Sequence, residues 1–412
     1  MAVNCRITAP ARIVGEISLP ASKSISNRVL LIDALCPTRG HLRNLAQCDD
    51  TDALRDALAS SCATEVNVGA AGTAMRFLTA YFATREGRSV LIDGSARMRQ
   101  RPIKVLVDAL RRLGADIQYA GAEGFPPLKI QGKRIHGGEL IVSGSVSSQY
   151  ISALLLIAPV IGGLRLMIEG EMMSRPYIEM TVALMARYGV EAVWNGNVID
   201  VPAGAYHAID FTVEADWSAA SYWWAMQAIM PQSRITLKGL EAQSLQGDSR
   251  IAELMAQMGV TGNWCGQYLD LRSNGGAGFC CSTFADLSGT PDIAQTLVVM
   301  LCVMGRPFRL TGLRTLRIKE TDRLEALRTE LLKLGYAVKV EGDDAISWHC
   351  QTVQPEANPH ISTYHDHRMA MAFAPAAIRF PGLVIDDAQV VSKSYPEFWE
   401  HLRAVGFKIE EV

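Results

Sequence analysis

The side chains best suited to chemistry in this sequence gather at six short turns, each of which runs directly into an apolar segment with helical character. These turns begin at Ser22, Gly72, Ser147, Asp216, Thr290 and His365. A helix N-terminus presents free N–H groups and carries about half a positive charge. Several such ends pointing to one place would form a site for anions.

Basic residues accompany the first of these turns and also a separate loop that precedes another helix. Lys23, Ser24 and Arg28 open the first apolar segment, and two cations near a helix N-terminus oppose its dipole unless an anion neutralises them. Arg101 ends an alternating basic run that starts at Arg97, and its planar guanidinium suits carboxylate or phosphate. Solvated surface charges are the alternative explanation for both groups.

Small polar residues mark two further turns. Gly72 would let a ligand approach the backbone closely, although a glycine required only for packing explains it equally well. Ser147, Ser148 and Gln149 offer hydroxyl and amide groups to a ligand. Simple capping of the helix that follows is the alternative for these three residues.

The segment Lys319-Glu320-Thr321-Asp322-Arg323 is the sharpest local pattern. Taken alone, Thr321 or Asp322 could cap the next helix, and Glu320 with Arg323 could be a surface ion pair. However, other charged residues lie at comparable points in neighbouring units of the repeat that is described below. These residues are Asp292, His367, Arg368 and Lys393. A carboxylate among several cations is a candidate acid or base with a shifted pKa.

A structural repeat along the chain, visible in its helix pattern, would position these turns. The segments 151–161, 296–304 and 369–378 are apolar all round, which predicts buried helices. Amphipathic helices followed by glycine, a residue that fits a left-handed C-cap, end at Gly114, Gly189, Gly259, Gly335 and Gly406. Their separations of 75, 70, 76 and 71 residues suit a unit of two helices and several strands.

The pattern predicts six such units, the first of which is short. Its second helix, expected over 52–59, is followed by no glycine, and about twenty residues are missing between Ala59 and Val68. A chain of 412 residues that is 49% hydrophobic has ample core for two or three domains. Six units divide into two domains of three.

Charge and composition exclude several classes of partner. A net charge of −2 gives no global case for nucleic acid or an anionic membrane. No apolar signal region or run of ~18 apolar residues occurs, so we expect a soluble, cytoplasmic protein. The nine cysteines form no CxxC pair, and His365-Asp366-His367, which could ligate a metal, has no second ligand cluster. We therefore expect no metal.

Taken together, these motifs resemble the enolpyruvyl transferase family, in particular the 5-enolpyruvylshikimate-3-phosphate synthases of the shikimate pathway of aromatic amino-acid biosynthesis. The resemblance covers almost the whole chain. It rests, in order, on Leu19–Ser24, Ala71–Arg76, Arg101–Ile103, Ser147–Tyr150, Arg175–Tyr177, Pro291–Asp292, Lys319–Leu324, Asp366–Ala370 and Lys393.

The resemblance implies an α/β fold, a two-domain inside-out barrel in which each domain has three βαβαββ units around buried helices. Residues 1–20 with 215–412 would form one domain, on the phosphoenolpyruvate side, and 21–214 the other, on the shikimate 3-phosphate side, and the two would close on the substrates. It further implies a monomer that needs no cofactor, no metal and no macromolecular partner, and that is a target of the inhibitor glyphosate.

The resemblance also assigns the site. Shikimate 3-phosphate would be held by Lys23, Ser24, Arg28, Ser147, Ser148, Gln149, Ser174, Asp292 and Lys319. Phosphoenolpyruvate would be held by Lys23, Gly72, Arg101, Gln149, Arg323, Arg368 and Lys393. Glu320 would protonate C3 of phosphoenolpyruvate and Asp292 would accept the proton of the 5-hydroxyl. Lys23, His367 and Lys393 would share these proton transfers.

The sequence departs from the family pattern in three places, and two rival functions remain. Ala70 and Thr315 stand where the family usually has Asn, and the first unit is short. The related transferase that acts on UDP-N-acetylglucosamine carries a cysteine before the arginine of its mobile loop, whereas residues 93–101 contain none. A non-catalytic anion-binding protein on the same scaffold would be expected to lack Glu320 or Asp292, and both are present.

Overall fold

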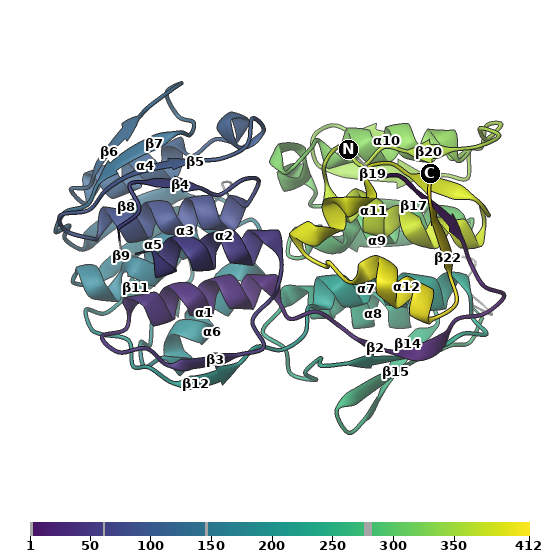
Figure 1. Ribbon diagram of the computed structural model, residues 1–412, viewed down its shortest axis with the longest axis horizontal. Helices are drawn as coiled ribbons and strands as arrows, with labels where there is room; N and C mark the ends of the chain where they lie inside the picture. The colour runs from purple at the N-terminus through teal and green to yellow at the C-terminus, as the bar shows by residue number, and fades with distance from the viewer. Residues whose placement is uncertain (1–2, 61, 145–146, 276–281) are drawn as a thin grey trace. The chain divides into compact units, whose positions relative to one another are not determined.

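The chain forms two compact units, each of mixed α/β structure (Figure 1). The computed structural model describes residues 3–60, 62–144, 147–275 and 282–412. Ser22–Val213 form one unit, the continuous domain, and Met1–Ala21 with Glu214–Val412 form the other, the discontinuous domain.

Both domains consist of βαβαββ repeats, and the four strands of a complete repeat form one sheet. In repeat 2, for example, β4 (Glu65–Asn67) and β5 (Ser89–Asp93) are parallel. Strands β6 (Asp116–Tyr119) and β7 (Leu128–Gln131) form a hairpin, and β7 pairs antiparallel with β5. A parallel pair needs a long crossover, and a helix supplies it in repeats 2, 3, 5 and 6, where the two parallel strands are consecutive in the chain. The helix therefore lies against one face of its own sheet.

The continuous domain holds repeats 1 to 3. Repeat 1 consists of β12 (Asp210–Thr212), α1 (Lys23–Leu35), β3 (His41–Arg43) and α2 (Asp49–Ala59). Repeat 2 consists of β4 (Glu65–Asn67), α3 (Gly72–Ala83), β5 (Ser89–Asp93), α4 (Lys104–Arg112), β6 (Asp116–Tyr119) and β7 (Leu128–Gln131). Repeat 3 consists of β8 (Gly138–Ser143), α5 (Ser148–Ile157), β9 (Leu164–Glu169), α6 (Arg175–Arg187), β10 (Val193–Asn195) and β11 (Val198–Val201).

Repeat 1 lacks the hairpin of the other repeats, which confirms the expected truncation. Its sheet has only the parallel pair β12 and β3 among the described residues. After α2 the chain enters β4, which already belongs to the sheet of repeat 2. Helix α2 starts at Asp49, three residues earlier than predicted, because Asp49, Asp50 and Asp52 in its first turn complement the helix dipole.

The discontinuous domain holds repeats 4 to 6. Repeat 4 consists of β2 (Val14–Ser18), α7 (Trp217–Ile229), β13 (Arg234–Lys238), α8 (Ile251–Ala256), β14 (Val260–Cys265) and β15 (Tyr268–Ser273). Repeat 5 consists of β16 (Thr283–Asp286), α9 (Ala294–Val303), β17 (Phe308–Thr311), α10 (Arg323–Lys333), β18 (Lys339–Glu341) and β19 (Ala345–Trp348). Repeat 6 consists of β20 (His360–Ile361), α11 (His367–Phe373), β21 (Leu383–Ile385), α12 (Phe398–Ala404), β22 (Lys408–Glu411) and β1 (Cys5–Thr8).

Strand β1 completes repeat 6 although it comes from the other end of the chain. It pairs antiparallel with both β21 and β22, so that Cys5 lies opposite Ile385 on one side and Glu411 on the other. Strand β2 likewise serves as the first strand of repeat 4, parallel to β13. The N-terminal segment therefore contributes to two sheets of one domain before the chain enters α1.

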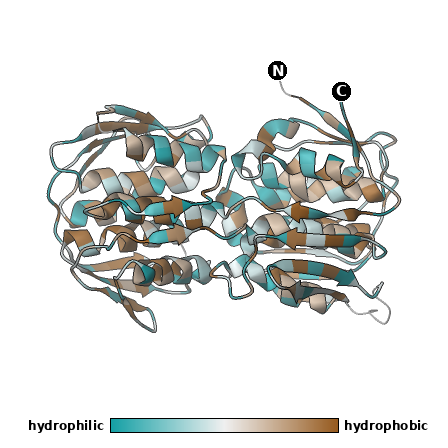
Figure 2. Cartoon of the chain, turned by 60° about the horizontal axis from the view of Figure 1, so that its bottom comes forward, coloured by the Kyte–Doolittle hydropathy of each residue, from teal (hydrophilic) through white to brown (hydrophobic). Residues whose placement is uncertain are grey.

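The first helix of each repeat forms the core of its domain. Helices α1, α3 and α5 pack on one another, as do α7, α9 and α11 through α9. Every residue of α9 is buried, in agreement with the all-round apolar pattern. Hydrophilic and hydrophobic residues alternate along many strands (Figure 2), because one sheet face packs on helices and the other meets water.

The predicted helix ends are confirmed. The six polar turns lead into α1, α3, α5, α7, α9 and α11, with one turn of 3₁₀ helix, Pro291–Ile293, before α9. Ser22, Ser147, Asp216 and Asp366 each accept a backbone N–H bond as the N-cap. The five glycines that follow the second helices all have positive φ, between 81° and 100°.

Candidate active site

Arg323 is the centre of a buried ionic cluster in the discontinuous domain. It is the first residue of α10, after the N-cap Asp322, and is 1% exposed. Its guanidinium donates to Asp366 (Nε–Oδ2, 2.7 Å), Asp292 (Nη1–Oδ1, 3.2 Å) and Glu320 (Nη2–Oε2, 3.0 Å). The Glu320–Arg323 pair is thus not the surface ion pair that was the alternative explanation.

The pKa of Arg323 reflects this arrangement. Burial acts to lower it, but the carboxylates of Asp366, Glu320 and Asp292 outweigh burial and raise the pKa above its usual value. The guanidinium therefore stays charged, and it offers three neighbouring carboxylates a fixed planar set of donors.

Further cations contact the two carboxylates that were predicted to move protons. Lys393 Nζ lies 2.7 Å from Glu320 Oε1. Arg368 Nη2 lies 3.1 Å from Asp292 Oδ2, and Lys319 Nζ lies 3.7 Å from Asp292 Oδ1. The Glu320 and Asp292 side chains keep 11% and 16% of their surface exposed. Each carboxylate is therefore held between cations yet remains open to solvent.

Asp366 connects this cluster to α11 and was missed as a site residue. Its side chain is fully buried, and Oδ1 accepts the backbone N–H of Arg368 at 2.9 Å while Oδ2 binds Arg323. His367, the next residue, is 1% exposed. A capping Asp followed by His and Arg marks the position in the sequence, but the partner of Asp366 lies 43 residues away.

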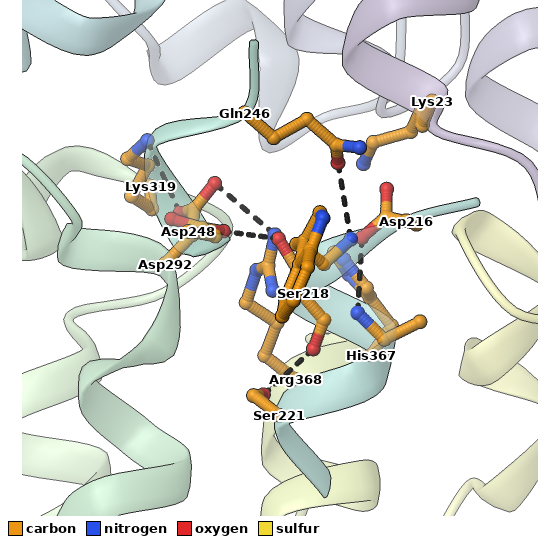
Figure 3. A network of polar contacts seen from close by, with 12 residues as sticks. Lys23, Asp216, Ser218, Ser221, Gln246, Asp248, Asp292, Lys319, His367 and Arg368 are labelled. Carbon is orange, nitrogen blue, oxygen red and sulfur yellow. Dashed lines mark hydrogen bonds and ion pairs between the residues drawn. The ribbon is translucent and has the colours of Figure 1, made fainter. Parts of the chain in front are cut away.

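Ser218 and Asp248 extend the cluster (Figure 3) and were also missed. Ser218 Oγ donates to Asp248 Oδ2 and accepts from Arg368 Nη2 at 3.3 Å. Asp248 is 4% exposed, and burial, with a smaller contribution from Asp292, raises its pKa to about 7. No local motif marks Asp248, so only the structure brings it to this place.

The raised pKa of Asp248 predicts a pH dependence of stability. Between about pH 4 and 7 the folded chain holds a proton here that the unfolded chain releases, so stability should fall as the pH rises through this range. Urea unfolding should show the wild type losing about 2 kcal/mol between pH 5 and 8 relative to Asp248→Asn. The exposed Asp343→Asn serves as the control. Parallel pH profiles for wild type and Asp248→Asn would contradict the prediction.

In the continuous domain, Lys23 and Arg28 are not solvated surface charges. Lys23 Nζ pairs with Asp50 Oδ2 of α2 at 3.0 Å, a partner that sequence reasoning missed. Arg28 is 3% exposed and donates to Thr181 Oγ1 at 2.8 Å and to the Tyr177 carbonyl at 3.1 Å. Burial lowers the pKa of Arg28 to about 10. Arg28 thereby fastens α1 to α6.

The serines predicted to bind shikimate 3-phosphate lie at helix starts in the same domain. Ser24 is in the first turn of α1, and its carbonyl accepts from Arg28 at 2.8 Å. Ser147 caps α5 through the N–H of Gln149, and Ser148, 8% exposed, is the first residue of that helix. Ser174 is the buried residue before α6 and has a positive φ of 54°. The Ser147 hydroxyl therefore serves as the cap of α5.

Arg101 lies against Gly72, the first residue of α3. A Cβ at Gly72 would come within 2.7 Å of both terminal nitrogens of Arg101. Gln149 reaches the same helix start, where its Nε2 donates to Thr73 Oγ1 at 3.3 Å. Arg99 binds Asp93 (2.9 Å) and Arg97 binds Gln100 (3.4 Å), both at the surface.

This contact makes Gly72→Ala a sharp test of the predicted phosphoenolpyruvate contacts. The added methyl must displace the Arg101 guanidinium, because its Cβ would lie closer to both terminal nitrogens than Cβ atoms are found in real structures. We expect KM for phosphoenolpyruvate to rise about tenfold with kcat within about twofold, the pattern of a lost binding contact. Inhibition by glyphosate, which is bulkier than phosphoenolpyruvate, should weaken more. Equal effects on substrate and inhibitor would place Gly72 outside the pocket.

The remaining predictions concern a departure from the family pattern, a metal and a membrane. Thr315 is buried in the 3₁₀ helix Arg314–Ile318, and its hydroxyl has no hydrogen-bond partner among the described residues. No group of three or more potential metal ligands occurs in the described part of the chain. In the motif His365-Asp366-His367, which could have ligated a metal, His365 is exposed and bonds Asp387, whereas Asp366 bonds Arg323. Nor does any described helix have the length and apolar character to cross a membrane.

Two domains of βαβαββ repeats, with cations and carboxylates at the starts of their buried helices, define a recognisable class of α/β protein. Structures of EPSP synthase from Acinetobacter baumannii share the fold, with TM-scores of 0.77 and 0.76 at 21% identity. The first covers 99% of this chain and 100% of its own, and the second 99% of each.

The sequence profile of the family described as EPSP synthase (3-phosphoshikimate 1-carboxyvinyltransferase) matches residues 7–60 and 55–402. A 3-phosphoshikimate 1-carboxyvinyltransferase of Bacteroides fragilis is 50% identical over 407 residues, 98% of both chains. One of Shewanella piezotolerans is 35% identical and covers 97% of this chain and 99% of its own. The chain belongs to the EPSP synthase family, which confirms the resemblance drawn from its motifs.

Proposed function

We propose that this chain is an enzyme that transfers the enolpyruvyl group of phosphoenolpyruvate to the 5-hydroxyl of shikimate 3-phosphate and releases phosphate. Its relatives carry the name 3-phosphoshikimate 1-carboxyvinyltransferase. The observation that carries the proposal is the pair of partly open carboxylates, Glu320 and Asp292, each held between cations around Arg323.

The proposed reaction is an addition followed by an elimination. Glu320 gives a proton to C3 of phosphoenolpyruvate, which makes C2 electrophilic, and the 5-oxygen bonds to C2 as its proton passes to Asp292. Loss of the C2–O bond to phosphate and of a proton from C3 then restores the double bond. Carbon needs an acid and the hydroxyl needs a base, and the two carboxylates supply both functions. Lys23, His367 and Lys393 share these transfers.

The cations of the cluster serve the anionic substrates. Four of them, Arg323, Arg368, Lys319 and Lys393, face the three carboxylates Asp292, Glu320 and Asp366. While the neighbouring Asp248 is protonated, the four cations exceed the three carboxylates by one charge, which favours phosphate and carboxylate groups and stabilises negative charge that develops during phosphate loss. We assign phosphoenolpyruvate to Arg323, Arg368 and Lys393, together with Lys23, Gly72, Arg101 and Gln149.

Shikimate 3-phosphate is assigned mainly to the continuous domain, to Lys23, Ser24, Arg28, Ser147, Ser148, Gln149 and Ser174, with Asp292 and Lys319 from the discontinuous domain. Each domain then supplies part of the charge that both substrates need. The chemistry requires no cofactor or metal, and we propose that the enzyme acts as a cytoplasmic monomer.

The test is phosphate release by the purified chain with phosphoenolpyruvate and shikimate 3-phosphate, beside a parallel reaction with UDP-N-acetylglucosamine as the acceptor. We expect turnover only with shikimate 3-phosphate. Turnover with the amino sugar would favour the related transferase. No turnover with either acceptor, while both shikimate 3-phosphate and phosphoenolpyruvate bind, would favour a non-catalytic binding protein.

A further inference from the structure

The turn before α11 has an unusual backbone. Tyr364 and His365 have φ values of 54° and 55°, and the Asp366 N–H donates to the Thr363 carbonyl at 2.9 Å. Positive φ at both central residues is the pattern of a type I′ turn, which favours Asn and Gly at these positions. Tyr and His are strained there, so other contacts must hold the turn.

The Tyr364 side chain supplies one such contact. Its hydroxyl donates to Oε1 of Glu330 at 2.6 Å. The Glu330 side chain is fully buried, and its Oε2 accepts from the Ser362 N–H at 3.0 Å and from Lys333 Nζ at 2.7 Å. Burial and the Glu330 carboxylate both raise the pKa of Tyr364. The hydroxyl therefore remains a hydrogen-bond donor at neutral pH.

His365 makes the second contact, which is weaker. Its Nδ1 lies 2.8 Å from Asp387 Oδ2, but the His365 side chain is 92% exposed. Solvent-exposed pairs of this kind contribute little to stability. The bond from Tyr364 to the buried Glu330 is therefore the main anchor of the turn.

The turn ends on Asp366, which binds Arg323 and caps α11 in front of Arg368. Arg323 and Glu330 are seven residues apart on α10, which places them on the same face of that helix. Two bonds, Tyr364 to Glu330 and Asp366 to Arg323, thus fasten the turn to one face of α10. A shift of the turn would move Asp366 away from Arg323 and displace the start of α11.

We propose that Tyr364 is a positioning residue. Its bond to Glu330 holds the strained turn in place, so that Asp366 keeps the side chains of Arg323 and Arg368 at fixed positions relative to each other. The inference rests on the proposed function, which assigns both arginines to phosphoenolpyruvate. Tyr364 acts through Asp366 and is assigned no contact with substrate. Its removal should therefore affect one substrate more than the other.

The variant Tyr364→Phe removes only the hydroxyl. We expect KM for phosphoenolpyruvate to rise about tenfold, the size of one lost hydrogen bond to a charged group, while KM for shikimate 3-phosphate stays within about twofold. Adding His365→Gly to this variant should bring KM for phosphoenolpyruvate back to within about threefold of wild type, because glycine adopts positive φ without strain.

Lys333→Gln is the matched control, since it removes another side-chain bond to Glu330, together with the bond to the His360 carbonyl, but no bond to residues 363–366. Hydrogen exchange supplies a readout that is independent of activity. The N–H groups of Arg368 and Met369, which bond Asp366, should exchange faster in Tyr364→Phe than in Lys333→Gln.

Unchanged exchange and unchanged KM in Tyr364→Phe, equal changes in Lys333→Gln, or no recovery in the double variant would overturn the positioning role. If the wild-type chain releases no phosphate, the proposed function fails by itself. The exchange rates then still decide whether Tyr364 holds the turn.

Discussion

Replacing Glu320 by Gln should lower kcat by about a hundredfold or more, because Gln keeps the size and hydrogen-bonding shape of the side chain but has no acidic proton to give to carbon. Asp292→Asn should behave alike through the loss of the base. Binding of both substrates should persist or tighten, because each change removes one negative charge from a site for anions.

Calorimetric titration of shikimate 3-phosphate into each variant separates catalysis from anchoring. Glu325→Gln is the control, because Glu325 lies in the first turn of α10, close to Glu320 in sequence, but pairs with Arg328 at the surface. The kcat of this variant should stay within about twofold of wild type. Loss of binding in Glu320→Gln would mean that this carboxylate anchors substrate, and an unchanged kcat in either variant would show that the assigned role in proton transfer is wrong.

Replacing Arg323 by Met should destabilise the chain by about 3–5 kcal/mol, the usual result of removing one partner from a buried ion pair. Asp366, whose side chain is fully buried, would lose its closest cation. Activity should disappear as well, since Arg323 also holds Glu320 and Asp292. Urea unfolding gives the free-energy difference between variant and wild type.

Two further variants test the physical cause of this loss. Arg328→Met, on the same helix with a half-exposed partner, should cost less than about 1 kcal/mol. Adding Asp366→Asn to Arg323→Met should recover part of the stability, because it removes the uncompensated buried charge. A loss in Arg323→Met no larger than that in Arg328→Met would show that the cluster does not stabilise the fold.

The sequence predicted the repeat and the helix starts because local chemistry determines both. Capping residues such as Asp216 and Asp366, and glycines such as Gly335, act within one helical turn of their own position. The missing hairpin of repeat 1 was visible from spacing alone, because every other repeat has nearly constant length. Periodicity and caps thus sufficed for the fold class and the truncation.

Partners at long range could not be predicted in this way. The bond from Arg323 to Asp366 and the approach of Asp248 to Ser218 depend on how α7, α10 and α11 pack, which no local pattern encodes. Local pattern marked the basic run from Arg97 to Arg101, but it did not show that the Arg101 guanidinium lies against Gly72 at the start of α3. Tertiary packing, rather than residue type, separates these arginines.

The pairing of β1 with β21 and β22 has a consequence for synthesis on the ribosome. Residues 22–213 are contiguous, so the continuous domain has all its strands and helices soon after Val213 leaves the ribosome. Repeat 6 cannot form until synthesis is almost finished, because Cys5 in β1 pairs with Ile385 in β21 and Glu411 in β22. During that interval β1 is an exposed, unpaired strand, the kind of edge that binds chaperones or neighbouring chains. The discontinuous domain is therefore the part of the nascent protein that is more prone to aggregation and chaperone binding.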